Sequence, residues 1–354
     1  MKKKIIIAIG VWLSLLLILV VLYFNGLKPV SKSSQVKSFT VSTGTSKLDI
    51  VSDLKEAGLI KSKMSLYVYV LLNRNINLQA GTYELNTNMS AEEILEKISA
   101  GEINKDGVIY NLTFVEGKRI TDYVKYIAKK TNYTEEEILA VMNDRDYLKE
   151  LIDSYWFLTE DILDEKLYYP LEGYLFPDTY ELYNDSSIKD IINRMLSGMT
   201  DKLTPLKSEL EASKYSIHEI LTMASVVENE EAVTEYRAGV AGVFYNRLNN
   251  NWPLGSDVTS YYGVKKDFST ALYQSELDDC NPYNTRGICA IKGLPLGPVS
   301  NPSLDSIKAA LNPTNHDFYY FVADKNKKTY FTKTYDEHIA KTNELKAAGL
   351  WYEY

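Results

Sequence analysis

Two stretches of the sequence share the pattern that decides the fold class: FTVSTGTSKLDIVSDL at residues 39–54 and LTFVEGKRITDYVKYI at residues 112–127. With Gly44 aligned to Gly117, apolar residues stand five and three positions before each glycine, and six, seven and ten positions after it. Apolar residues at every second position, as before the glycine, are typical of a strand. Apolar residues three and four positions apart, as after the glycine, are typical of one face of a helix. Each stretch is therefore expected to form a strand, a glycine turn and an amphipathic helix, which favours an α+β fold.

A related unit follows the first stretch. Tyr83 and Leu85 alternate as in a strand, and Ser90 with Glu93 forms the capping-box pattern that begins many helices. Residues 38–110 are therefore predicted to form a small α+β subdomain. Such a unit serves as a glycan-binding module as readily as it serves as a spacer, and the residues alone leave both roles open.

The start of the chain predicts a membrane anchor and a linker. Residues 5–24 carry no charge, and a helix of that length crosses a hydrocarbon core of roughly 30 Å. The lysines at positions 2–4 place the N-terminus in the cytoplasm and the rest of the chain outside. A cleaved signal peptide is the alternative, but the apolar run is long for one and no small-residue cleavage site follows it. The anchor is assigned to residues 1–25 and a polar, Ser-rich linker to residues 26–37.

Composition excludes several classes of protein. The 354 residues include 39 basic and 47 acidic ones, a net charge of −8. Without the three anchor lysines, 36 basic residues stand against 47 acidic ones, which gives about −11 for the rest of the chain. This balance is not typical of a nucleic-acid-binding protein. Three histidines and two cysteines do not favour a zinc site, and neither a metal nor a cofactor is predicted.

The first candidate for chemistry lies in SIHEILTMASVVENEEA, residues 216–232, which is expected to form a helix with Ser216 as its N-cap. Glu228 falls about 20° from the apolar stripe of that helix. Burial favours the protonated form of a carboxyl group, so Glu228 is a candidate general acid. The alternative is a structural glutamate held by a buried arginine or by a helix terminus. Glu230 is expected to point away from the stripe into solvent.

Arg247 lies on the apolar stripe of the next predicted helix, residues 234–249. It is expected either to neutralise an inward carboxylate or to bind a carbonyl or carboxylate group of a substrate. Loops rich in Gly, Pro, Asn and Tyr follow, as expected where backbone is presented to a ligand. These loops are LGSDVTSYYG at residues 254–263, PYNTRG at residues 282–287 and GLPLGPVSNPS at residues 293–303. Cys280 and Cys289 flank PYNTRG and are predicted to form a disulfide bond outside the cytosol.

These motifs resemble those of a known family, the membrane-anchored endolytic murein transglycosylases, also called YceG-like proteins. The resemblance rests on ordered motifs: LEGYLFPDTY (171–180), ASVVENE (224–230), VAGVFYNRL (240–248), SDVTSYYG (256–263), PYNTRG, GLPLGPVSNPS and FYYFVAD (318–324). With the anchor and the strand–helix units, it covers nearly the whole chain. It implies a LysM-like subdomain followed by a catalytic transglycosylase domain over residues 111–354, and it places the family's catalytic glutamate on Glu228.

The resemblance implies a lytic transglycosylase reaction. Glu228 would protonate the oxygen of the β-1,4 bond between MurNAc and GlcNAc, and would then deprotonate the C6 hydroxyl of the sugar as a 1,6-anhydro ring closes. Asp257 is the candidate carboxylate that supports the positively charged intermediate. The other candidates for contact with the glycan are Glu172, Arg247, Tyr283 and Asn284.

Two other functions stay open. A muramidase would hydrolyse the same bond with a second catalytic carboxylate, and a non-catalytic scaffold would only bind the cell wall. The resemblance implies peptidoglycan strands as substrate, cell-wall synthases of the elongation or division machinery as partners, and a role in limiting strand length. The chain departs from the family pattern at Val258, Arg286 and Ile339, where the family usually has proline, an aromatic or hydroxyl residue, and asparagine.

Overall fold

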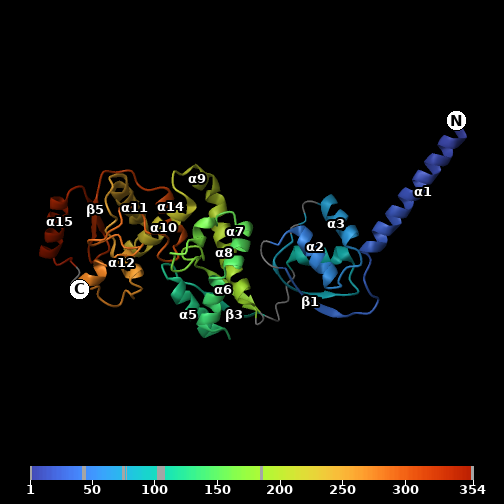
Figure 1. Cartoon of the computed structure of the whole chain (residues 1–354), viewed down its shortest axis with the longest axis horizontal. Coiled ribbons are helices and arrows are strands. Elements are labelled where there is room, and N and C mark those ends of the chain that lie inside the picture. The colour runs from blue at the N-terminus through green and yellow to red at the C-terminus, as the bar shows by residue number, and fades with distance from the viewer. Residues whose placement is uncertain are drawn as a thin grey trace. The chain divides into compact units, whose positions relative to one another are not determined.

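The computed structural model describes residues 2–41, 45–73, 76, 78–101, 108–183 and 186–351, without the side chains of residues 2–9, 11, 13, 15 and 108–110. The chain divides into two compact units. The first comprises Met1–Tyr110 with Tyr183–Asp185, and the second comprises Asn111–Leu182 with Ser186–Tyr354. Figure 1 colours the first unit mainly blue to teal and the second green to red. Each unit is described by itself.

The first unit combines a two-stranded sheet with helices. Its elements are α1 (Lys2–Leu27), β1 (Val36–Val41), α2 (Lys47–Glu56), α3 (Lys63–Leu72), β2 (Gly81–Asn86) and α4 (Ala91–Ala100). Strands β1 and β2 are antiparallel, with Phe39 opposite Tyr83. Side chains from the sheet and from α2, α3 and α4 form one apolar core. The predicted capping box at Ser90 and Glu93 is confirmed at the start of α4.

The predicted anchor is not settled by this structure. In the part of the chain that is described, no helix is both long enough and apolar enough to cross a membrane. The structure does not describe the side chains of residues 5–9, 11, 13 and 15, which belong to the predicted anchor. The anchor therefore stays a prediction.

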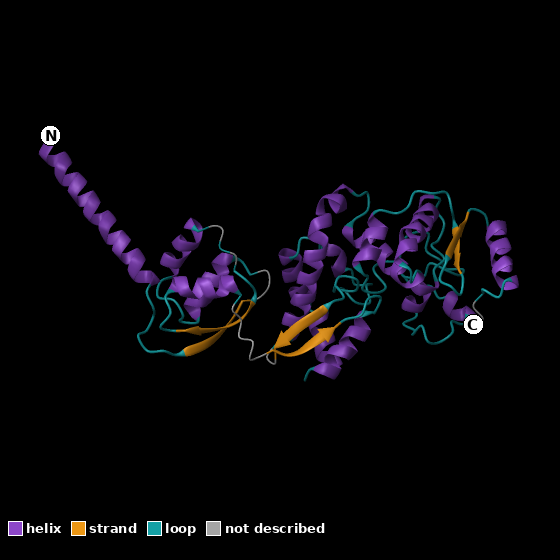
Figure 2. Cartoon of the chain, turned by 180° about the vertical axis from the view of Figure 1, so that it is seen from behind, coloured by secondary structure: helices purple, strands orange, loops and turns teal. Residues whose placement is uncertain are grey.

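The remaining elements build the second unit. The strands are β3 (Val108–Thr113), β4 (Thr179–Tyr183), β5 (Tyr320–Ala323) and β6 (Thr329–Thr332), paired as β3 with β4 and β5 with β6. The helices are α5 (Ile120–Lys130), α6 (Glu135–Met142), α7 (Arg145–Ser154), η2 (Glu160–Leu163), α8 (Ile188–Leu203), η3 (Thr204–Leu206), α9 (Lys207–Ala212), α10 (Ile217–Glu230), α11 (Thr234–Asn249), α12 (Asp257–Gly263), α13 (Gln274–Leu277), α14 (Leu304–Leu311) and α15 (Tyr335–Ala347). Figure 2 shows the small sheets among these helices, so the mixed α+β prediction is confirmed.

The repeated strand–turn–helix pattern is confirmed in the second of its two copies. Strand β3 leads to Gly117, whose φ of 71° is a left-handed conformation that glycine adopts without strain, and α5 follows. The apolar residues expected to face inward, Tyr123, Val124 and Ile127, are buried. In the first copy β1 and α2 form as expected, while Gly44 lies outside the described residues.

Helix α10 is the central helix of the second unit. Ser216 caps it as predicted, accepting a hydrogen bond from the backbone N–H of Glu219 at 3.2 Å. Residues 220–227 are all buried, because α10 packs against α11, α12 and α14 (Figure 1). A helix enclosed in this way has no face that is wholly open to solvent, which decides the surroundings of the glutamates at its end.

Candidate active site

Glu228 forms a buried ion pair with Arg237 of α11. The guanidinium donates from Nη1 to Oε2 at 3.2 Å and from Nη2 to Oε1 at 3.0 Å, so both carboxylate oxygens are engaged. Only 6% of the Glu228 side chain and 8% of the Arg237 side chain are exposed. Two parallel charge-assisted hydrogen bonds of this kind fix the orientation of the carboxylate.

Ser303, the N-cap of α14, completes the surroundings of this pair. Its backbone N–H and its hydroxyl both donate to Glu228 Oε2, at 2.9 Å and 2.5 Å. Arg237 also donates to Ser303 Oγ at 2.7 Å and to the carbonyl of Glu231 at 3.0 Å. A buried arginine that holds Glu228 is the contact expected from the structural alternative, while the catalytic role of Glu228 stays a prediction. The arginine is Arg237 rather than Arg247.

Glu230 has a different environment, and the expectation that it points into solvent is wrong. It is partly buried, because the start of α12 covers that side of α10, and it accepts a hydrogen bond from the Ser256 hydroxyl. Burial raises the pKa of Glu230, and the charge of Asp257 raises it further. The Ser256 hydroxyl and the positive charges of Arg247 and Arg286 act in the opposite direction, and the net pKa is raised. Glu230 is thus a partly buried residue whose carboxyl group retains its proton to higher pH than usual.

Asp257 stands beside this carboxyl group at the first turn of α12. Half of its side chain is exposed, and it forms a salt bridge with Arg286 at 2.6 Å. Arg286 is one of the positions at which the sequence departs from the family pattern, and 48% of its side chain is exposed. The predicted candidate Asp257 therefore lies where a ligand can reach it.

Arg247 does not pair with Glu228, and its electrostatic interaction is with a second inward carboxyl group, Glu230. Its guanidinium donates to the carbonyl of Tyr319 at 2.8 Å and to the carbonyl of Leu254. It is partly buried, and its positive charge lowers the pKa of Glu230. Arg247 therefore fixes the loop that precedes α12 and contributes charge to the neighbourhood of Glu230.

Glu172 is not in a position to line a glycan groove, because it is only 2% exposed. Its Oε1 accepts from the backbone N–H of Ile120 at 2.9 Å and from Asn301 Nδ2 at 3.2 Å, and its Oε2 accepts from the Tyr262 hydroxyl at 3.1 Å. Burial raises its pKa to about 8. The carboxyl group joins α5, α12 and the loop before α14.

Tyr283 and Asn284 are also buried, at 1% and 0% exposure, and the prediction that they contact sugars is not supported. Tyr283 packs against Tyr168 and Tyr262, with ring centroids 4.7 Å apart in both pairs. The amide of Asn284 donates to the carbonyls of Leu277 and Asp279 and accepts from Ser260 Oγ. These side chains organise the loop from inside.

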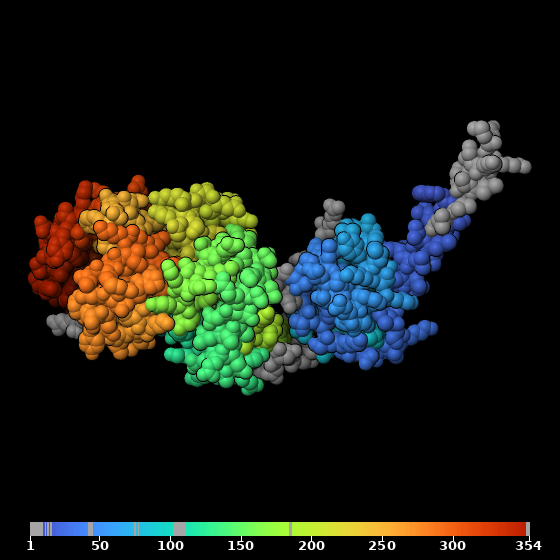
Figure 3. Space-filling view, in the orientation of Figure 1, coloured from blue at the N-terminus to red at the C-terminus, as the bar shows by residue number. Residues whose placement is uncertain are grey.

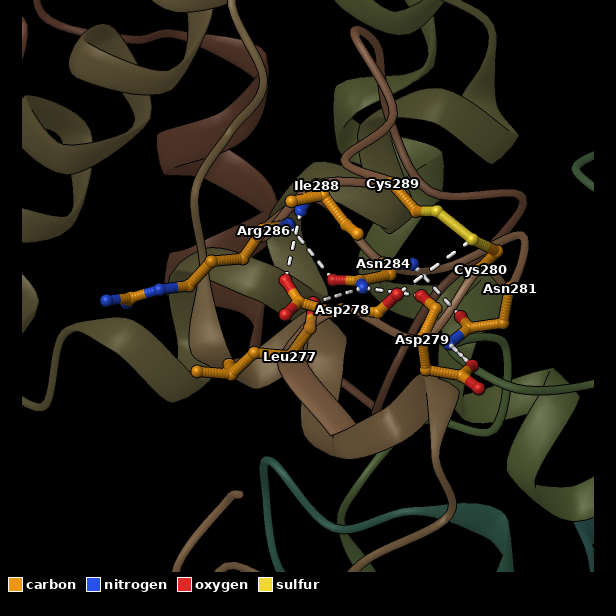
Figure 4. The surroundings of a disulfide bond; sticks show 9 residues. All are labelled: Leu277, Asp278, Asp279, Cys280, Asn281, Asn284, Arg286, Ile288 and Cys289. Atoms are coloured by element: carbon orange, nitrogen blue, oxygen red, sulfur yellow. Dashed lines mark hydrogen bonds between the residues drawn. A yellow bond between two sulfur atoms is a disulfide. The ribbon is translucent and has the colours of Figure 1, made fainter. Parts of the chain in front are cut away.

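The predicted disulfide bond between Cys280 and Cys289 is confirmed, with Cα atoms 5.1 Å apart. Figure 4 shows Asn284 between this bond and the end of α13, where it ties the loop together. The same loop reaches the start of α12, because Thr285 accepts from the backbone N–H groups of Gly255 and Ser256 at 2.9 Å and 3.2 Å. The disulfide-bonded loop therefore supports the segment that carries Ser256.

Besides Glu230 and the serines that contact the two glutamates, Arg237 and Gly117 were not predicted as site residues. Arg237 stands three and seven residues before Val240 and Phe244, so its place on the apolar stripe of α11 was a signal that could have identified it. Gly117, in the turn before α5, lies against α10. An added Cβ at Gly117 would lie 3.4 Å from Glu228 Cγ and 3.3 Å from Asn229 Oδ1. The repeat located this glycine but gave no indication of the contact.

Among the residues that the structure describes, no cluster of His, Cys, Asp or Glu is arranged to hold a metal ion. The site that the side chains do form is a carboxyl group with a raised pKa, Glu230, on a buried helix, bordered by the charged pair of Asp257 and Arg286. An arrangement of this kind can donate and accept a proton.

The fold and this carboxyl group define a candidate acid–base site on a mixed α+β unit. The chain belongs to the YceG-like family, whose model matches residues 39–344. It is 35% identical over 315 residues to an endolytic murein transglycosylase of Bacillus subtilis, covering 88% of this chain and 86% of that protein. An endolytic murein transglycosylase of Streptococcus pneumoniae is 33% identical over 330 residues, covering 89% of this chain and 59% of that protein. The crystal structure of a YceG-like protein from Listeria monocytogenes superposes with a TM-score of 0.62 at 32% identity, covering 87% of this chain and all of the other.

Proposed function

We propose that this chain is an endolytic murein transglycosylase, which cleaves the β-1,4 bond between MurNAc and GlcNAc within a glycan strand and leaves a 1,6-anhydroMurNAc end. Two relatives that match most of the chain carry that name. The observation that carries the chemistry is Glu230, a partly buried glutamate with a raised pKa near the half-exposed pair of Asp257 and Arg286. The role would be the limitation of nascent strand length.

Glu230, rather than Glu228, is the proposed acid. A general acid must hold a proton and reach the substrate. Glu228 receives two hydrogen bonds from an arginine and two from Ser303, which occupy both of its oxygens. Glu230 receives one hydrogen bond from a serine hydroxyl, and its surroundings raise its pKa. The assignment of Glu228 is the alternative, and a comparison of the two Gln variants tests it.

One carboxyl group suffices for the reaction. Protonated Glu230 would donate to the glycosidic oxygen as the bond to C1 of MurNAc breaks, and the resulting carboxylate would take the proton of the C6 hydroxyl. The C6 oxygen then bonds to C1, and the anhydro ring closes without water. Asp257 is placed to stabilise the positive charge that develops at the sugar, because its side chain is half exposed and lies close enough to raise the pKa of Glu230.

The same position of Asp257 favours a second candidate function. A muramidase needs a second carboxylate that attacks the sugar or activates water, and Asp257 is the exposed carboxylate beside Glu230. The salt bridge between Asp257 and Arg286 argues against a muramidase, because a carboxylate paired with an arginine is a weaker nucleophile.

Product mass separates the two functions. Detergent-solubilised full-length protein is incubated with purified sacculi, and the released fragments are analysed by mass spectrometry. The transglycosylase gives ends that are one water lighter than hydrolysed ends. If only hydrolysed ends are found, the protein is a muramidase and the proposal is wrong. If the strands stay intact, the protein is a non-catalytic scaffold that binds the wall.

The chain is also proposed to be a single-pass protein of the cell membrane, with residues 5–24 as the anchor and the catalytic unit outside. The lysines at positions 2–4 and the uncharged run after them support this topology. The first unit would serve as a LysM-like glycan-binding subdomain, supported by its order of β1, α2, α3 and β2. Cell-wall synthases of the elongation or division machinery are the proposed partners.

The proposed topology predicts that the catalytic unit is accessible from outside the cell. Protease added to intact protoplasts should degrade the chain beyond residue 37, while a cytoplasmic marker protein survives. Protection of the chain until the membrane is permeabilised would reverse the orientation.

A further inference from the structure

A cavity of about 270 Å³ lies in the second unit beside the glutamates of α10. It is bordered by the turn after β3, by the start of α5 and by the loop after α12, and it reaches Asn229 between Glu228 and Glu230. The loop and the start of α5 are joined, since Arg119 Nη1 donates to the carbonyl of Lys266 at 2.8 Å. On the face seen in Figure 3, the orange surface of the segments after α12 abuts the green surface of the segments between β3 and α8.

The lining of this cavity is basic, although the chain as a whole is acidic. Five basic and three acidic residues line it: Lys118, Arg119, Lys125, Lys265, Lys266, Glu116, Asp122 and Asp267. Two of the acids already accept local hydrogen bonds, Asp122 from the backbone N–H of Arg119 and Asp267 from that of Ser269. Across the residues that the structure describes, Lys118 and Lys125 are exposed and their amines form neither a salt bridge nor a hydrogen bond.

Arg119 provides a second, independent sign of a missing anionic partner. Its Nη2 is buried and has no hydrogen-bond partner within the described part of the chain. The guanidinium lies over the rings of Tyr262 and Phe268, at 5.3 Å and 4.9 Å from their centroids. A buried donor without a partner is destabilising, and an anionic ligand would satisfy it. Phe268 is 45% exposed, and both it and Arg119 line the cavity, so the guanidinium lies at the wall that a ligand would contact.

We infer that this cavity is a subsite for carboxylate groups of the glycan strand, an inference that rests on the proposed function. Two unpaired ammonium groups and a guanidinium with a free donor match a carboxylate, which is the anionic group that peptidoglycan carries. Two sources share this chemistry, the lactyl group of MurNAc and the stem peptide. The position of Asn229 on α10 places the subsite next to the reacting bond.

The test replaces the two unpaired lysines together, as Lys118→Gln with Lys125→Gln. Full-length wild type and variant are compared on soluble strands with free carboxylates and on the same strands amidated at those groups. We expect the variant to raise KM on the free strands by roughly 10-fold with little change in kcat, because the contact acts on bound substrate and transition state alike. On amidated strands wild type and variant should have the same KM.

Denuded strands distinguish the two sources, because removal of the stem peptide frees the lactyl carboxylate, which is amide-linked in peptide-bearing strands. If the variant also raises KM on denuded strands, the lactyl carboxylate is the group that binds the subsite. If it raises KM only on peptide-bearing strands, the group is a carboxylate of the stem peptide. Lys129→Gln with Lys130→Gln is the matched control, because both lysines are exposed on α5 outside the cavity and should leave KM unchanged.

Binding of the strands to the full-length protein is measured in parallel by co-sedimentation, so that the subsite is tested even if no strand is cleaved. Weaker binding of free than of amidated strands, or the same KM for variant and wild type on free strands, would overturn the subsite. Absence of cleavage by the wild type, with carboxylate-dependent binding intact, would overturn the proposed function alone.

Discussion

Glu230→Gln should lower strand cleavage by at least the roughly 10²–10⁴-fold that acid–base catalysis contributes, with the fold intact. Glutamine has nearly the same size, and its amide oxygen can accept the hydrogen bond from Ser256, but it has no proton to transfer. Because one group would serve both proton transfers, we expect the loss to lie at the upper end of that range. Release of anhydro-ended fragments is the measurement, and circular dichroism checks folding.

Glu228→Gln is the paired variant that decides between the two glutamates. If Glu228 is structural, this change lowers the stability of the second unit, and the molecules that remain folded still cleave. If cleavage is lost in folded Glu228→Gln and kept in Glu230→Gln, the sequence prediction was right and our reassignment is wrong.

The raised pKa of Glu230 gives a further check: cleavage by the wild type should fall as the pH rises through that pKa, since the acid must be protonated.

Arg237→Met should lower the free energy of unfolding by about 3–5 kcal/mol, the usual cost of leaving one partner of a buried ion pair alone. The substitution removes both hydrogen bonds to the Glu228 carboxylate and leaves that charge in a site where 6% of its side chain is exposed. Equilibrium urea unfolding of the detergent-solubilised chain, followed by near-ultraviolet circular dichroism, measures the change.

Two comparisons make the Arg237 result specific. Arg145→Met removes the same chemical group from an exposed salt bridge to Glu165, whose partners are 54% and 87% exposed, and should cost less than about 1 kcal/mol. Adding Glu228→Leu to Arg237→Met should recover part of the loss, because no unpaired charge is then buried. Equal losses at Arg145 and Arg237 would show that the Glu228 pair does not behave as a buried one.

Local pattern was sufficient to predict much of the framework. Ser216 and the apolar stripe after it predicted α10, because an N-cap and a helical repeat depend only on neighbouring residues. The strand, glycine turn and helix around Gly117 were predictable for the same reason. Cys280 and Cys289, nine positions apart across a turn, were close enough in sequence to predict the bond between them.

The site itself depended on contacts between elements far apart in sequence. Helical phase placed Glu230 opposite the apolar stripe, but α12 covers that side of α10, and phase within one helix carries no information about it. Ser303 meets Glu228 across 75 residues, so the saturation of that carboxylate had no local signal. Tyr283 and Asn284 lie in a loop of exposed character, yet side-chain hydrogen bonds and ring contacts hold them inside.

The disulfide-bonded loop has a consequence for how this enzyme can change. Thr285 touches the backbone of Ser256, and Arg286 pairs with Asp257, so the loop contacts both neighbours of the Glu230 carboxyl group without being part of α10. A closed ring of ten residues restrains the chain at those contacts whatever its other side chains are. A substitution at Arg286, the half-exposed side chain of this ring, can therefore change the charge beside Glu230 while the buried helix stays unaltered.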